Sequence, residues 1–172
     1  MIKTKNVKDS MKIFIIAVII SAFVIPMKDA CAIFQLTVGG RDIDFGFMKI
    51  GEWKELTDEG YYQNEITCQS DKGNTWYLKV HLLTPFESGE NDIEPSRFKW
   101  KVVEVVDGNG IITNEGMFND FSQSPNVVYT SGGDDSNGGE VKVRLSYGLQ
   151  IPTGQAAGNY RVYLRYTLSE TL

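Results

Sequence analysis

The side chains that could act as a nucleophile, a base or a metal ligand are few in this chain of 172 residues. It contains one histidine, His81, and two cysteines, Cys31 and Cys68. A catalytic histidine needs a nucleophile beside it and a third group to orient it, and no Gly-x-Ser-x-Gly segment occurs. His81 stands near Lys79 on the polar side of an alternating run, which predicts a surface position. We therefore expect no catalytic residue, no cofactor and no enzymatic activity.

Two acidic segments are the remaining candidates for site chemistry. The loop from Gly132 to Gly139 contains Asp134 and Asp135 among glycine, serine and asparagine, and carboxylate and carbonyl oxygens are ligands of Ca²⁺. Its spacing does not fit an EF-hand, and a solvated loop explains the same composition, so we predict no metal site. The second acidic segment lies between residues 42 and 59 and contains Asp42, Asp44, Glu52, Glu55, Asp58 and Glu59. Glycoside hydrolysis needs two carboxyl groups facing one cleft, and the sequence places no pair in that way.

The first 32 residues differ from the rest of the chain. Four lysines in the first twelve residues precede an apolar run from Ile13 to Ile25, and Ala30-Cys31-Ala32 offers small residues for cleavage. This is the pattern of a secretory signal peptide, which starts at Met1 or at Met11. A retained membrane anchor is the competing interpretation, but about 13 apolar residues are short of the roughly 20 that span a bilayer. An acylated Cys31 is weaker still, because charged residues precede it.

Cleavage after residue 32 predicts a mature domain of residues 33–172 that is secreted, periplasmic or at the cell surface and meets the membrane only during export. It retains 12 basic and 20 acidic residues, a net charge of −8, which argues against nucleic acid or anionic membranes as partners. Cys68 then stands alone, either buried and inert or paired with another chain. Earlier cleavage would leave Cys31 to pair with Cys68. We favour the buried thiol, because Cys68 shares a strand face with Ile66.

Apolar and polar residues alternate through most of the mature sequence. The alternation is clearest in five runs: 34–38, 76–82, 98–102, 141–149 and 160–168. Successive side chains of a strand point to opposite faces, so such runs predict antiparallel sheets with one buried face. Turn-forming residues separate them, and Asp107-Gly108-Asn109-Gly110 between two apolar pairs predicts a hairpin.

These features predict one all-β domain, an immunoglobulin-like antiparallel β-sandwich of about eight or nine strands. No segment of the mature chain has a convincing helical period. Trp76 and Trp100 are the expected anchors of the core, because large aromatic side chains bury the most area. Cys68 is expected in the core with them.

Three segments together resemble bacterial fimbrial and spore-coat-U-type domains. They are Ile43-Asp44-Phe45-Gly46, the strand end Glu65-Ile66-Thr67-Cys68, and the stretch from Leu149 through Pro152-Thr153-Gly154-Gln155 and Gly158-Asn159-Tyr160 to Leu168. The resemblance implies an exported immunoglobulin-like sandwich. In the pilin branch it also implies a missing strand, which a chaperone and then a neighbouring subunit supply by β-augmentation.

The chain departs from this family pattern in two respects. The first cysteine of the family is missing after cleavage, and about ten residues between Ala32 and Ile43 leave room for only one strand. Donor-strand exchange and a self-complete sandwich therefore both remain open.

The leading functional hypothesis is a non-catalytic structural or interaction subunit, of a fimbria-like or surface assembly, that associates through its terminal strands, residues 33–38 and 160–168. The residues expected at this intersubunit edge are Phe34, Leu36, Val38, Tyr160, Val162, Leu164 and Tyr166. The alternative is a monomeric extracellular module that binds a glycan or another ligand through aromatic side chains on its surface. The aromatic candidates are Trp53, Tyr61, Tyr77 and Tyr163, with the Asp134–Asp135 loop as an additional candidate.

Overall fold

The computed structural model describes residues 32–40, 42–56 and 62–172. All but the last residue of the predicted signal peptide lies outside these ranges, as do Cys31 and Tyr61. Within the described ranges, no helix has the length and apolar character needed to cross a bilayer.

Twelve strands and two short 3₁₀ helices lie within the described residues, joined by turns and loops. In chain order they are β1 (Phe34–Gly40), β2 (Trp53–Leu56), β3 (Asn64–Ser70), β4 (Tyr77–Leu82), β5 (Phe86–Ser88), β6 (Asn91–Ile93), η1 (Pro95–Arg97), β7 (Phe98–Val106), β8 (Ile111–Ile112), β9 (Asn119–Asp120), β10 (Asn126–Thr130), η2 (Asp134–Ser136), β11 (Glu140–Gln150) and β12 (Leu164–Ser169). The strand pairings are antiparallel, so the all-β prediction is confirmed.

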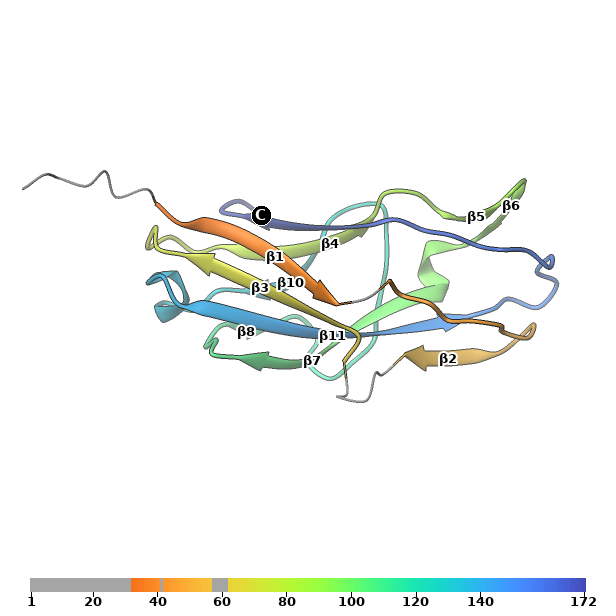
Figure 1. Ribbon diagram of the computed structural model, residues 1–172, viewed down its shortest axis with the longest axis horizontal. Coiled ribbons are helices and arrows are strands. Elements are labelled where there is room, and N and C mark those ends of the chain that lie inside the picture. The colour runs from red at the N-terminus through yellow and green to blue at the C-terminus, as the bar shows by residue number, and fades with distance from the viewer. Residues whose placement is uncertain (1–31, 41, 57–61) are drawn as a thin grey trace, which may run out of the picture. The chain divides into compact units, whose positions relative to one another are not determined.

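The strands form two sheets that pack face to face, with a small β5–β6 hairpin at one end (Figure 1). The larger sheet has the order β1-β3-β11-β7-β9, and β2 also pairs with β11. The smaller sheet has the order β12-β4-β10-β8. The orders β1-β3-β11-β7 and β12-β4 correspond to strands A-B-E-D and F-C of an immunoglobulin sandwich. The predicted β-sandwich is therefore confirmed.

The core lies between the inner faces of the two sheets. Ile66, Cys68 and Val143 contribute from the larger sheet, and Leu78 and Val80 from the smaller one, all with no exposed surface. The alternation is visible in β4, where every second residue is buried. The alternating pattern of the sequence therefore determines which face of each sheet is covered.

The hairpin predicted at Asp107–Gly110 is wrong. The strand before it, β7, belongs to the larger sheet, whereas β8 pairs with β10 in the smaller sheet. The amide of Asn109 donates to Asp135 Oδ1 (3.0 Å) and the amide of Gly110 donates to Tyr129 Oη (2.6 Å). Because the amides of this turn bind other elements, the turn carries the chain from one sheet to the other.

On the outer face of the larger sheet, a tryptophan ring packs directly on a glycine of the neighbouring strand. The indole ring of Trp53 on β2 covers Gly148 on β11, so a Cβ at position 148 would overlap the ring. The ring of Phe118 contacts Trp53 edge to face, with 5.2 Å between ring centroids. Trp53 nevertheless remains 40% exposed.

Candidate functional site

The terminal strands β1 and β12 lie beside each other, and each leaves one edge unpaired. Within the described residues, β1 pairs only with β3 and β12 only with β4. The amide of Asp71 donates to Ile33 O (3.2 Å), and the amide of Leu83 donates to Tyr163 O (2.8 Å). Hydrogen bonding alternates along an antiparallel strand. The even-numbered residues of β1 and β12 therefore direct their backbone N–H and C=O groups away from β3 and β4, toward the unpaired edges.

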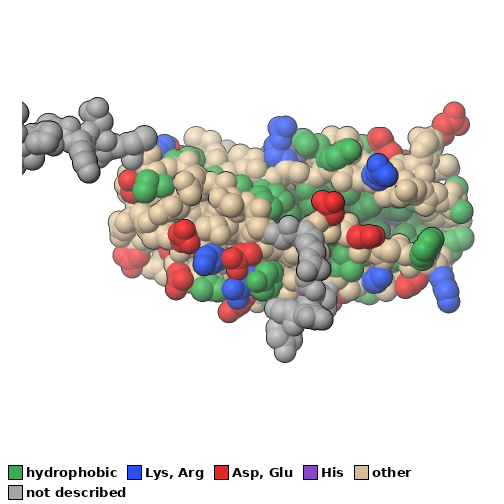
Figure 2. Space-filling model, in the orientation of Figure 1, with side chains coloured by type: hydrophobic (Ala, Val, Ile, Leu, Met, Phe, Trp, Pro, Cys, Tyr) green, Lys and Arg blue, Asp and Glu red, His purple; other side chains and the backbone are tan. Residues whose placement is uncertain are grey.

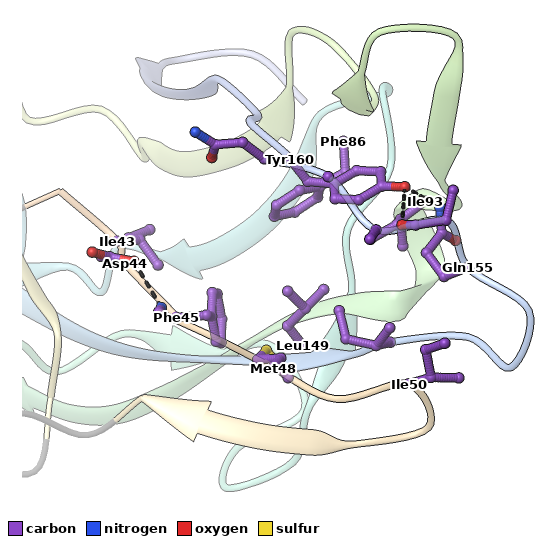
Figure 3. Close-up of a pocket in the computed structure, with 16 residues that line it drawn as sticks. Ile43, Asp44, Phe45, Met48, Ile50, Phe86, Ile93, Leu149, Gln155 and Tyr160 are labelled. Carbon is purple, nitrogen blue, oxygen red and sulfur yellow. Dashed lines mark hydrogen bonds between the residues drawn. The ribbon is translucent and has the colours of Figure 1, made fainter.

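A groove opens between the sheets where the chain leaves β1. One wall is formed by residues 42–50, and the other by residues 155–166 (Figure 3). Two adjoining cavities of about 280 and 730 Å³ make up this edge groove, and both are lined by Ile43, Phe86 and Tyr160. Figure 2 shows hydrophobic side chains within the hollow on this face of the molecule.

The floor of the edge groove is apolar and aromatic. Phe86, Ile93, Phe98 and Leu149 lie at its base and are at most 6% exposed. The Phe98 ring is contacted edge to face by Phe86 and by Phe45, with 5.1 and 5.9 Å between centroids. These packed rings give the groove a rigid base suited to apolar side chains.

Local hydrogen bonds hold each wall in place independently of the other. On one wall, Lys54 Nζ donates to Phe45 O (2.5 Å). On the other, Gln155 Nε2 donates to Tyr160 Oη (2.7 Å), and that hydroxyl donates to Ala156 O (2.8 Å). Among the described residues, no backbone hydrogen bond joins the two walls.

The structure gathers some of the predicted edge residues into the groove and separates others from it. Tyr160, Val162, Leu164 and Tyr166 all line it. Phe34, Leu36 and Val38 lie on β1 outside its lining; the first two are partly buried, and Val38 is 45% exposed. The last strand begins at Leu164 rather than at residue 160, and one isolated bridge, between Arg161 and Glu87, precedes it.

Several groove residues were not among the predicted site residues. Ile43 and Phe45 belong to the segment that carries the family resemblance, which is the one sequence signal that points to them. Phe86 and Ile93 lie on three-residue strands, too short for alternation to be visible.

The predicted core anchors are all deeply buried. Trp76 and Cys68 have no exposed surface, and Trp100 is 1% exposed. The indole N–H of Trp76 donates to Asp135 O (3.2 Å).

The three described aromatic residues that were predicted to contact a ligand do not converge. Trp53 lies on the larger sheet. Tyr77 lies on β4, and Tyr163 precedes β12, so both are on the smaller sheet's side. Tyr163 is 63% exposed at the edge groove.

Asp135, in the loop considered for calcium, is a buried hydrogen-bond acceptor. Its carboxylate accepts hydrogen bonds from Tyr129 Oη (2.6 Å), Gly132 N (2.7 Å) and Asn109 N (3.0 Å). Burial, and then the hydrogen bond to Asp135, raise the pKa of the Tyr129 hydroxyl well above its usual value, so it remains a donor at neutral pH. The carboxylate therefore joins η2, β10 and the 107–110 turn. Among the described residues, the carboxylate of its neighbour Asp134 accepts a single hydrogen bond, from Asn109 Nδ2 (3.0 Å).

His81 lies on the less buried face of β4 with Tyr77 and Lys79, and is partly buried there. It faces Arg165 across the β4–β12 pair, and its Nδ1 atom is buried with no hydrogen-bond partner among the described residues.

Cys68 is a free thiol within the described part of the chain, and burial raises its pKa to about 12. The neutral thiol is a poor nucleophile, so we expect a thiol reagent at pH 8 to label the native protein at least about 100-fold more slowly than the urea-unfolded protein. Mass spectrometry of samples quenched over time measures both rates. Equal rates would contradict the buried position of this side chain.

Scans of protein-family models, curated proteins and solved structures found no match to this chain.

Proposed function

We propose that this chain is an exported, non-catalytic structural subunit that self-associates by receiving an extended segment of a second copy in the edge groove. The observation that carries the proposal is an apolar floor lying between two walls that no backbone hydrogen bond joins. An extended segment placed there gains main-chain hydrogen bonds from strand edges and buries alternate side chains on the floor.

The position of the family-like segments supports this proposal. Residues 43–46 line one wall, and residues 155–166, within the C-terminal family-like stretch, form the other. The resemblance to fimbrial domains implies that an open edge of the sandwich receives a strand from a neighbouring subunit. Here β1 occupies its own place beside β3, so the groove begins beyond β1 rather than along it.

Two of the side chains considered for site chemistry, Asp135 and His81, are engaged elsewhere or isolated, which supports a non-catalytic role. The carboxylate of Asp135 accepts three protein hydrogen bonds, and no described residue contacts His81 Nδ1 as a hydrogen-bond partner. A general base needs a substrate proton within reach and a partner to orient it.

Sedimentation velocity over a range of concentrations tests the proposal. The wild-type mature domain should associate, and Leu164→Asp should weaken association at least tenfold, or about 1.4 kcal/mol, because a carboxylate at the groove loses apolar contact. Ile111→Asp is the matched control, since Ile111 is 71% exposed on β8 at the opposite edge of the smaller sheet.

Val162→Asp, which also lies in the lining of the edge groove, provides a second variant in case Leu164→Asp does not fold, and circular dichroism establishes folding for each. A wild-type domain that stays monomeric at high concentration would refute self-association. Equal association by the control and the folded groove variants would refute the groove as its site.

A further inference from the structure

A short loop beside the edge groove presents an aromatic ring to solvent. The side chain of Phe47 is fully exposed, and Ile50, three residues later, is 62% exposed. Gly46 and Met48, the two neighbours of Phe47, line the groove, whereas Phe47 itself does not. Met48 and Ile50 lie on the same wall of the groove (Figure 3). The Phe47 ring therefore lies outside its own groove and is accessible to another molecule.

Hydrogen bonds hold this loop at both ends, although its tip is exposed. Gly46 N donates to Asp44 Oδ1 (2.7 Å), and Gly51 N donates to Ile151 O (2.9 Å). Gly46 and Gly51 both have a positive φ, +63° and +78°, which residues with a side chain rarely adopt. The segment Gly46–Ile50, called the loop tip below, is thus preorganised, so less conformational entropy is lost when it binds.

The backbone of the loop tip is also available for pairing. Within the described residues, no hydrogen bond uses the backbone N–H or C=O group of Phe47 or Met48. At the other wall of the groove, β12 has an unpaired edge, and Leu164 directs its backbone groups toward that edge. A loop tip from a second copy can therefore contribute main-chain hydrogen bonds together with an aromatic side chain.

The edge groove has room for the Phe47 ring of a second copy. Its larger cavity measures about 730 Å³, within the roughly 300–1,000 Å³ of pockets that enclose a small molecule. Phe86 and Phe98 line this cavity, and aromatic rings pack favourably edge to face or with an offset. Tyr163, which is 63% exposed, adds a third aromatic side chain to the lining.

Two uncompensated charges at this place are complementary between copies. Within the described residues, neither the Lys49 ammonium group nor the Asp42 carboxylate has an ion-pair partner, and both residues are exposed. Asp42 lines the larger cavity, whereas Lys49 belongs to the loop tip. A loop tip that enters the groove of a second copy therefore brings its Lys49 toward Asp42 of that copy.

We propose that two copies form a closed, two-fold symmetric dimer in which each loop tip enters the edge groove of the other copy. This inference rests on the proposed self-association and names the segment that the groove receives. Because residues 42–50 carry the loop tip and also form one wall of the groove, tip and groove lie side by side. One two-fold axis then makes both contacts at once and leaves neither groove open to a third copy.

Phe47→Ala is the critical variant, because it removes a fully exposed ring that does not pack in the core. Met117→Ala is its matched control, since Met117 is 60% exposed and precedes β9, at the opposite edge of the larger sheet. In sedimentation velocity, the wild-type mature domain should saturate at the mass of two copies. We expect Phe47→Ala to weaken dimerisation at least about 30-fold, because two ring contacts are lost, and Met117→Ala to leave it within about twofold.

A charge exchange tests the same arrangement independently. Lys49→Glu and Asp42→Lys should each weaken dimerisation at least about threefold, and the double variant should recover the wild-type affinity to within about twofold. The effects of the single variants should shrink at about 1 M salt, because exposed charges are then screened.

The outcomes separate this inference from the proposed function. Weaker association of Leu164→Asp together with unchanged association of Phe47→Ala would retain the groove as the site but overturn the loop tip as its occupant. Species that grow beyond two copies with concentration, or a double charge variant that is not rescued, would overturn the closed dimer. A wild-type domain that stays monomeric would refute both the self-association and the dimer.

Discussion

Asp135→Asn is expected to lower the free energy of unfolding by about 3 kcal/mol. The carboxylate accepts from three donors, the Tyr129 hydroxyl and the amides of Gly132 and Asn109. An amide in its place turns an NH₂ group toward at least one of these donors, and a hydrogen bond to a charged group contributes roughly 1.5–3 kcal/mol. Urea denaturation followed by circular dichroism measures the change.

Asp134→Asn is the matched control for this loss. Asp134 is adjacent in sequence but exposed, and its carboxylate accepts one hydrogen bond, from Asn109 Nδ2. Its replacement should cost less than about 1 kcal/mol. Equal losses in the two variants would contradict a central role for Asp135 in joining the loop to the sheets.

Trp76→Ala is expected to lower the free energy of unfolding by about 3–5 kcal/mol. The side chain has no exposed surface, packs 5.6 Å from the Tyr129 ring between centroids, and donates its N–H to Asp135 O. Its removal leaves a cavity in the middle of the core and frees a carbonyl oxygen. A loss of this size is a large fraction of the stability of an ordinary domain.

Trp53→Ala serves as the comparison, because Trp53 is 40% exposed on the outer face of the larger sheet. It should cost less than half as much as Trp76→Ala in the same denaturation experiment. The reverse order would show that the outer aromatic contact, rather than the inner core, carries the stability of the sandwich.

Long alternating runs were the predictable part of the fold. β4 and most of β11 follow the pattern of one buried and one wetter face, so their existence and orientation could be deduced from the sequence. The strands β5, β6, β8 and β9 have two or three residues each, too few to show a period. The glycine and asparagine residues of the 107–110 turn predicted a hairpin. In the structure, the amides of Asn109 and Gly110 instead donate to side chains on η2 and β10.

The edge groove depends on contacts between distant parts of the chain. The edge groove needs residues 42–50 and 155–166 to face each other, more than 100 positions apart in sequence. The terminal strands could be predicted as sheet edges. The opening of a groove between the two sheets beyond the end of β1 could not be predicted.

The contact between Trp53 and Gly148 limits how β2 can lie on β11. Trp53 faces Gln150 in the register, and its ring covers Gly148, where no Cβ stands in the way. A slide of β2 by two residues along β11 would bring the ring over Ser146 or Gln150, whose side chains occupy that space. The absence of a side chain at Gly148 therefore fixes the register of β2, a strand of four residues, on β11. Any change at position 148 would have to be matched by a smaller residue at position 53.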